Sequence, residues 1–211
     1  MGCVLSLGDP YATSDQLKGY LGMNTADNTD NTQITDALNS VSREIEKFCH
    51  RQFNDAGSAT ARVYYPDGYN RTCVDDFSTT TGLIIKSDSA GDGTYATTWL
   101  ATDVQCEPLN GVVDGETGWP FWKLRAVGNQ AFPCSWAGSI APLQVTARWG
   151  WTAVPAAVKQ ACLILASETF RLKGAPFGVA NMDQFGPVRV RDNPMAAKKL
   201  APYVLNPVLV A

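Results

Sequence analysis

The chain has 211 residues, of which 45% are apolar, enough to bury a core in one domain or two small ones. Its formal net charge of −3 is close to neutral and indicates no particular class of partner. No run of about 18 apolar residues occurs, so the sequence predicts neither a transmembrane helix nor a membrane partner.

Charge is distributed unevenly along the chain. Residues 1–151 carry 10 Lys and Arg against 17 Asp and Glu, whereas residues 152–211 carry 7 against 3. A basic C-terminal part can meet an acidic protein surface or nucleic acid, or it can be an ordinary solvated face. The cations form no dense patch, so tight binding of phosphates is not expected.

The six cysteines fit no zinc pattern, because none of them forms a Cys-x-x-Cys pair. No secretory signal precedes them, and free thiols are therefore expected. The first six residues, MGCVLS, match the N-myristoylation pattern through Gly2 and Ser6. No polybasic segment follows, so a short packing or disordered arm is the preferred interpretation.

Two helices are predicted near the N-terminus. Residues 13–21 begin with a capping box, Thr13 to Gln16, and end at Gly22. Residues 32–49 form an amphipathic helix of about five turns, because apolar residues recur at steps of four and three. The residues on this apolar face are Ile34, Leu38, Val41, Ile45 and Phe48.

Strand patterns punctuated by Gly, Pro and Asp fill residues 62–149. RVYY and RTCV flank the turn PDGYN and predict one hairpin. GLIIKSD and TYATTWLA flank SAGDG and predict another. Further strands are expected in DVQCEP, WPFWKLRAV and LQVTARW. We interpret this stretch as a small antiparallel β domain inserted between helices.

A helix is predicted over residues 152–174, with Pro155 in its first turn and Gly174 at its end. Its apolar residues cover most of its circumference, whereas a surface helix normally keeps a polar face. Two explanations stay open. The helix is central within one compact domain, or its second apolar side is covered by the inserted domain or by another copy of the chain.

The C-terminal part begins with a loop over residues 175–187, and VRVR is a candidate strand. PMAAKKLAPY predicts a short helix. The last eight residues, 204–211, are mostly aliphatic, although chain ends are usually polar. Such a tail needs a groove, on its own domain or on another chain.

Candidate catalytic chemistry is weak throughout. His50 is the single histidine and follows a helix, where a basic residue suits the helix dipole. Asp88 and Asp92 resemble half of a calcium loop, but Ala90 occupies a ligand position, so a hairpin turn is preferred. Asp75 and Asp76 are interpreted as the end of a strand at a turn. The sequence therefore predicts no enzyme, no catalytic or metal-binding residue and no cofactor.

Several of these segments together resemble a known family. They are YATSDQLKGYLGM, ALNSVSREIEKFCHRQF, RVYYPDG, GDGTYATTW and GWTAVPAAVKQACLILASETFRLKGAPFGV, with LAPY near the end. This order closely resembles the head-to-tail connector (adaptor) proteins of long-tailed bacteriophages, particularly those of actinobacterial phages. The resemblance spans nearly the whole chain, and W-G-W-x-x-V-P-x-x-V-K-Q-A is its most specific part.

The resemblance implies an α+β fold, with a helical core formed by N- and C-terminal helices and an inserted antiparallel β-rich domain. The expected divisions are 1–56 for the N-terminal helices, 57–151 for the β-rich insertion and 152–211 for the central helix, loop and docking tail. Such proteins resemble one another in forming dodecameric rings under the portal vertex of the virion, where they lengthen the DNA channel. They are not enzymes.

The resemblance also implies partners. These are further copies of the chain, the portal protein, a downstream head-tail stopper or tail-terminator protein, and double-stranded DNA that passes without specific binding. Candidates for the subunit interface are Val158, Cys162, Leu165, Phe170, Phe177 and Phe185. Candidates for portal docking are Arg189, Arg191, Lys198, Lys199, Val204, Leu205, Val208, Leu209 and Val210.

A different class of function stays open beside this one. The chain could be a virion-associated binding module whose β domain recognises a surface ligand through exposed aromatic residues. Trp119 and Trp122 are the candidates for that role.

Overall fold

The computed structural model describes residues 8–133, 140–171 and 193–205. The chain divides into two compact units. One, here called the helical unit, contains Gly8–Phe53 and the described residues from Ala153 onwards. The other, here called the β unit, contains Asn54–Thr152. The fold is α+β, as predicted, with helices from both ends of the chain and an inserted antiparallel β-rich region.

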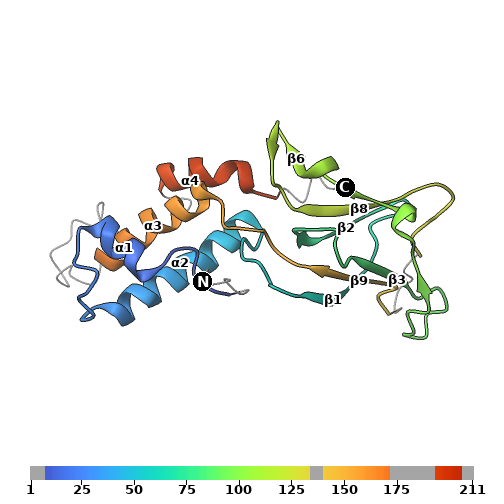
Figure 1. Cartoon of the computed structure of the whole chain (residues 1–211), viewed down its shortest axis with the longest axis horizontal. Helices are drawn as coiled ribbons and strands as arrows, with labels where there is room; N and C mark the ends of the chain where they lie inside the picture. Colours follow the sequence, from blue (N-terminus) through green and yellow to red (C-terminus); the bar gives the residue numbers. More distant parts are fainter. Residues whose placement is uncertain (1–7, 134–139, 172–192, 206–211) are drawn as a thin grey trace. The chain divides into compact units, whose positions relative to one another are not determined.

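The described part of the helical unit is built from four α-helices, which Figure 1 labels. They are α1 (Ser14–Leu21), α2 (Asn31–Cys49), α3 (Ala156–Arg171) and α4 (Pro194–Leu200). A 3₁₀ turn, Ala201–Tyr203, follows α4. The helix α3 packs against α1, α2 and α4, so it is the central element of this unit.

Local signals explain where the first two helices begin and end. The Thr13 hydroxyl accepts from the Gln16 N–H, and the Gln16 side chain accepts from the Thr13 N–H, so the predicted capping box is present. Gly22 ends α1 in the left-handed conformation. In α2 the predicted apolar face is buried through Ile34, Leu38, Val41 and Ile45, and Phe48 is half-buried.

The packing of α3 explains its apolar circumference. Val158, Ala161, Cys162, Leu165, Ala166 and Ser167 are buried, and the other helices of the unit supply the contacts. Leu163 and Ile164 are half-buried. Three neighbouring helices leave little of the surface for a polar face, because each buries a different apolar stripe. Of the two explanations that the sequence left open, the central position within its own unit applies to these buried residues.

The described residues of the β unit form two main sheets. The first has the order β1-β9-β3-β4, formed by Ala59–Tyr64, Leu143–Arg148, Ile84–Ser87 and Thr97–Thr98. The second has the order β2-β8-β5, formed by Arg71–Phe77, Phe121–Ala126 and Val104–Glu107. A two-stranded ribbon, β6 (Val112–Val113) with β7 (Glu116–Thr117), completes the described strands, and every pairing is antiparallel.

A hydrophobic core holds the β unit together. Strand β9 buries alternate residues, Leu143, Val145 and Ala147, as expected for a strand with one face on a core. The remaining buried members of the cluster are Val74, Phe77, Ile85, Leu124, Phe132 and Trp149. Both main sheets contribute to it, so the two sheets share one core.

One predicted hairpin is wrong and the other is confirmed. RVYY and RTCV do not pair, because β1 pairs with β9 and β2 pairs with β8, in different sheets. The local pattern identified both strands but not their partners, which come from distant parts of the chain. The hairpin on either side of SAGDG is present as β3 paired with β4. The strands expected in DVQCEP, WPFWKLRAV and LQVTARW are β5, β8 and β9.

The chain enters and leaves the β unit through adjacent backbone segments. Ala59 of β1 is paired with Arg148 of β9, and the Ala56 N–H donates to the Trp149 carbonyl at 2.9 Å. Gly150 has a φ of +90°, and a Cβ added there would lie 1.7 Å from the Asn54 carbonyl oxygen. Only glycine therefore fits this close approach of the two backbone segments.

Candidate functional site

Three predicted subunit-interface residues lie inside the helical unit. Val158 and Cys162 are 0% exposed and Leu165 is 1% exposed, all on α3. The neighbouring helices of the same chain cover them. Their side chains therefore present no surface to another copy, and this position does not fit the predicted interface role.

Phe170, near the end of α3, is the predicted interface residue that reaches the surface among those the structure describes. It is half-buried and borders a hollow of about 320 Å³ between α2 and the end of α3. The hollow is lined by Gln33, Asp36, Ala37, Ser40, Thr169 and Phe170. The other two predicted interface residues, Phe177 and Phe185, lie outside the described residues.

The predicted portal-docking residues are described only in part. On α4, Lys198 is exposed, whereas the Lys199 ammonium donates to the Gln160 side chain of α3 at 2.9 Å. Val204 and Leu205 are half-buried, and the Leu205 N–H donates to the Cys49 carbonyl at 2.9 Å. These two residues therefore belong to the helical unit itself. The other candidates lie outside the described residues: Arg189, Arg191, Val208, Leu209 and Val210.

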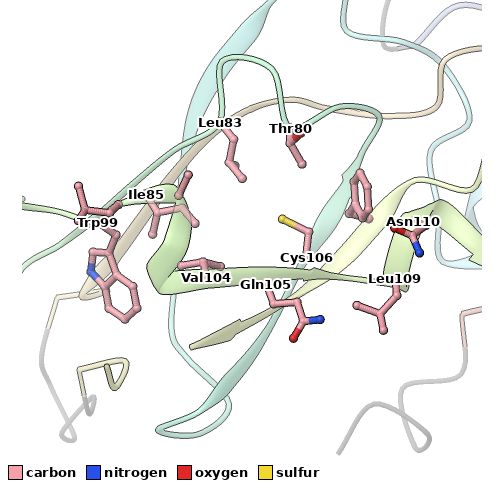
Figure 2. A pocket seen from close by; sticks show the side chains of 12 residues that line it. Thr80, Leu83, Ile85, Trp99, Val104, Gln105, Cys106, Leu109 and Asn110 are labelled. Carbon is pink, nitrogen blue, oxygen red and sulfur yellow. The ribbon is translucent and has the colours of Figure 1, made fainter. Parts of the chain in front are cut away.

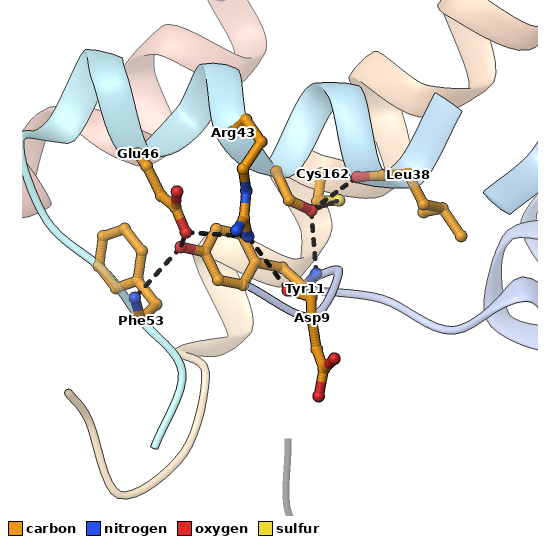
Figure 3. A network of polar contacts seen from close by, with 8 residues as sticks. Asp9, Tyr11, Leu38, Arg43, Glu46, Phe53 and Cys162 are labelled. Atoms are coloured by element: carbon orange, nitrogen blue, oxygen red, sulfur yellow. Dashed lines mark hydrogen bonds and ion pairs between the residues drawn. The ribbon is translucent and has the colours of Figure 1, made fainter. Parts of the chain in front are cut away.

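A polar network that the sequence did not predict fixes the beginning of the helical unit (Figure 3). The buried Tyr11 hydroxyl donates to Glu46 of α2 at 2.7 Å and accepts from the Phe53 N–H at 3.2 Å. The Arg43 guanidinium pairs with the same Glu46 carboxylate at 2.9 Å and donates to the Asp9 carbonyl at 3.2 Å. The network thus ties the segment before α1 to α2 and to the exit of the helical unit.

The buried position of Tyr11 has an electrostatic consequence. Burial raises the pKa of its hydroxyl far above the ordinary value, the Phe53 N–H acts in the opposite direction, and the Glu46 carboxylate raises it further. The hydroxyl is therefore a structural donor at neutral pH. A contact between residues 35 apart in the sequence leaves no local signal, which is why sequence reasoning missed it.

The predicted exposed tryptophans are not fully exposed. Trp119 is 9% exposed, and its ring lies 5.1 Å from that of Trp151 and 6.2 Å from that of Trp122. The Trp151 indole N–H donates to the Asp76 carboxylate at 2.9 Å. Trp122 is half-buried. The prediction of an exposed aromatic surface is therefore wrong for Trp119, because the other tryptophans cover it.

Backbone N–H groups donate to the Asp88 carboxylate in the loop that resembles half of a calcium site. Asp88 accepts from the N–H groups of Ala90, Gly91 and Gly93 at 2.7–3.1 Å, as in a tight turn. Burial acts against ionisation, but these hydrogen bonds hold the pKa of Asp88 below its ordinary value. The hairpin-turn interpretation agrees with this geometry.

The paired acids Asp75 and Asp76 lie within β2, not at its end as predicted. Asp75 accepts from the Arg62 guanidinium at 2.5 Å and from the Tyr64 hydroxyl at 2.9 Å. Asp76 is buried and binds the Trp151 indole. Each carboxylate therefore has a structural partner on a different element, and the two do not act together.

The described thiols are poor nucleophiles. Among the described residues, Cys49, Cys73, Cys106 and Cys162 are thiols that form no disulfide. Burial raises the pKa of Cys49 to about 12 and those of the other three to about 11. His50 is exposed and ends α2 in the left-handed conformation. Within residues 8–133, 140–171 and 193–205, no group of three or more His, Cys, Asp or Glu could hold a metal ion.

The β unit contains a larger cavity, of about 490 Å³ (Figure 2). Here it is called the groove. Figure 2 shows Leu83 and Ile85 on one side of it and Val104 and Cys106 of β5 on the other, with Trp99 at one end. No lining residue carries a charge: they are Thr80, Leu83, Ile85, Trp99, Leu100, Ala101, Val104, Gln105, Cys106, Leu109, Asn110 and Phe121. Leu100 and Leu109 are 67% and 53% exposed. The groove is thus uncharged, largely apolar and open to solvent.

Comparisons with known proteins bear on the fold of the chain. No family model and no curated protein matches the chain. A chain in the solved structure of the neck of an empty GTA particle, computed with C6 symmetry, has a similar fold with a TM-score of 0.56 and 16% identity. The match covers 95% of this chain and 93% of that chain. At this level of identity the similarity establishes the fold. None of the helices in the described part of the chain is long and apolar enough to cross a membrane.

Proposed function

We propose that the chain is a structural neck protein of a phage-like particle, a head-to-tail connector (adaptor) of the kind its sequence resembles. The observation that carries this proposal is the shared fold with a chain from the neck of a gene transfer agent particle, over nearly the full length of both chains. The fold likeness and the independent sequence resemblance indicate the same place in a particle, the junction of head and tail. The actinobacterial-phage type belongs to the proposal and rests on the sequence resemblance alone.

We propose further that the copies form a ring, dodecameric by the family resemblance. The ring would lie below the portal, extend the DNA channel and bind the head-tail stopper or tail-terminator protein on its other side. A ring requires a heterologous contact, in which one face of a copy meets a different face of the next. The six-fold symmetry of the similar neck structure is compatible with twelve copies.

The charges of the chain suit a conduit for DNA. The β unit carries 6 Lys and Arg against 10 Asp and Glu. A protein that binds the phosphate backbone tightly needs many cations opposite it. An acidic unit instead favours passage of DNA without specific binding.

The proposed portal-docking segment is the apolar tail, with Lys198, Lys199, Arg189 and Arg191 as basic contacts. Because Leu205 is bonded to α2, the separable part of the tail begins at residue 206. The experiment is to mix the full chain, or the chain ending at Leu205, with portal rings and to image them by electron microscopy. The full chain should add a ring to the portal, and the shortened chain should stay folded but not attach.

A second truncation is the matched control. Removal of residues 204–211 also deletes the Leu205 N–H bond to Cys49 and should lower the melting temperature, whereas the chain ending at Leu205 should melt as the full chain does. Normal attachment of the chain ending at Leu205 would disprove the role of the tail. Absence of any ring on the portal with the full chain would disprove the connector assignment.

The second candidate function, a virion-associated binding module, now depends on Trp122, because Trp119 is buried. The same images test it, because a monomeric module would leave portal rings bare. For the groups considered as catalytic candidates, the contacts are structural: Asp76 binds the Trp151 indole, Asp88 binds backbone N–H groups, and burial raises the pKa of Cys49.

A further inference from the structure

The groove of the β unit lies beside an unpaired strand edge. In its sheet, β5 is the outer strand and pairs with β8 alone among the described strands. Alternate N–H and carbonyl groups of such a strand point away from its partner and can bind a further strand. Val104 and Cys106 of β5 also line the groove. An extended segment added to β5 would therefore place every second side chain in the groove.

The chemistry of the groove selects an uncharged, apolar segment. Its twelve lining residues include no acid and no base, and most of them are apolar. A charged segment would lose its hydration there without gaining a partner. A nucleic-acid strand is excluded for the same reason, since its phosphates need cations.

The residues before Gly8, Met1–Leu7, fit these requirements. The sequence MGCVLSL has no charged side chain and no proline, so each of residues 2–7 can donate a backbone N–H. In an extended conformation Cys3, Leu5 and Leu7 share one side, because side chains alternate. Seven residues suffice to pair with the four residues of β5. The tail is a poorer candidate, because Pro207 lacks an N–H and the tail is already proposed for the portal.

We propose that residues 1–7 of one copy add as a strand to β5 of a second copy and fill its groove. This inference rests on the proposed ring, in which adjacent copies meet through unlike surfaces. The residues that follow this segment are held against α2, because the Asp9 carbonyl accepts from Arg43 and the Tyr11 N–H donates to Ser42 at 3.0 Å. Each copy then offers one strand and one groove, so the contact can repeat around a closed ring.

A cross-linking experiment on the full chain tests the proposal. The photoreactive residue p-benzoylphenylalanine replaces Leu5, and the protein is mixed with ¹⁵N-labelled chain before illumination. Mass spectrometry should find position 5 joined to groove residues between labelled and unlabelled chains. Cross-links confined within one chain, or to residues outside the groove, would overturn the proposal. The same probe at Ser6, on the opposite side, is the positional control.

Groove variants give a second measurement. Leu100→Asp and Leu109→Asp change exposed rim residues, so the fold should be kept, and each should lower the yield of groove cross-links about tenfold or more. Ile140→Asp, a 50% exposed residue of the β unit outside the groove, should leave the yield unchanged. Equal yields in all three variants would contradict the proposal.

The outcomes separate this inference from the proposed function. Cross-linked copies that leave portal rings bare would keep the strand addition and disprove the neck assignment. Rings that form on portal without cross-links to the groove would do the reverse.

Discussion

Tyr11 makes three hydrogen bonds within the helical unit, two through its hydroxyl and one through its backbone N–H. It donates to Glu46 and accepts from the backbone of Phe53, while its own N–H binds Ser42. The ring also packs edge-on against Phe53, with centroids 5.6 Å apart. Tyr11 thus ties the first described residues to α2 and to Phe53, in the segment that follows α2.

Tyr11→Phe should destabilise the protein by about 1–3 kcal/mol, because it leaves the Glu46 carboxylate and the Phe53 N–H without this buried partner. Urea unfolding measures the change. Tyr20→Phe is the matched control, because Tyr20 is 49% exposed and should lose almost nothing. Equal stability of the two variants would show that the network contributes no net stability.

Asp55 and Arg148 form a two-pronged ion pair at the entry of the β unit. Both carboxylate oxygens take part, and the Gly57 N–H donates to one of them at 2.8 Å. Burial acts in the opposite direction, but Arg148 and Gly57 hold the pKa of Asp55 below its ordinary value. A lowered pKa adds stability that is present above the ordinary value of 3.8 and is lost as the pH falls through the folded value.

Asp55→Asn should therefore cost about 1–2 kcal/mol at neutral pH, a figure kept small because solvent reaches the Arg148 side chain. The difference between wild type and variant should shrink as the pH falls below about 4. Urea unfolding at several pH values measures this dependence. Asp114→Asn, at an exposed turn, should track the wild type throughout. A pH-independent difference for Asp55→Asn would contradict the assignment.

At the scale of elements, variants on α3 distinguish residues of the core from residues of a subunit interface. Leu165→Ala should lower the free energy of unfolding of the isolated chain by about 2–5 kcal/mol, because it opens a cavity between packed helices. Phe170→Ala, at a half-buried position on the same helix, should cost clearly less and should instead weaken assembly if this part of α3 meets another copy. Chemical unfolding and sedimentation of both variants measure the two effects. A neutral Leu165→Ala would restore that residue as an interface candidate.

Local patterns predicted the elements well, for physical reasons that particular residues show. The Thr13 capping box and the four-three spacing from Ile34 to Ile45 act within one or two helical turns, so the sequence displays them directly. The partner of β1 is β9, about eighty residues later, and no nearby residue specifies it. The predicted hairpin between residues 62 and 74 is wrong because nearby residues determine whether a strand forms, but they do not determine which strand it pairs with.

The candidate site was harder to predict than the fold. The sequence pattern of an apolar helix surface is the same whether its own chain or a neighbouring copy covers it. Val158, Cys162 and Leu165 were therefore predicted to lie in an interface. The groove brings residues 80–85 together with residues 99–110 and Phe121, a combination that follows only from the arrangement of the sheets. The tight turn at Asp88, in contrast, was predicted correctly because its hydrogen bonds reach at most five residues along the chain.

At the scale of the whole molecule, the buried thiols predict sensitivity to alkali. Their raised pKa values mean that the folded chain keeps protons that the unfolded chain releases above pH 9.0. The resulting stability is complete below pH 9.0 and is lost as the pH rises towards about 12, the folded value for Cys49.

Urea unfolding between pH 8 and pH 12 checks this dependence, with values chosen to bracket the transition. The stability of wild type should fall steadily over this range. Serine does not titrate in this pH range. Cys49→Ser should therefore lose less stability with rising pH than Cys73→Ser, which replaces a half-buried cysteine. Identical slopes for the two variants would mean that burial of Cys49 does not govern its ionisation.

The pairing of Ala59 with Arg148 has a consequence for how such chains can diversify. The first and last strands of the β unit therefore lie one strand spacing apart, about 5 Å, where Ala59 pairs with Arg148. The roughly ninety residues between them could thus be shortened, exchanged or lengthened while the chain still connects α2 to α3. Related proteins could then keep the same helices and acquire new contacts by replacing only residues of the β unit.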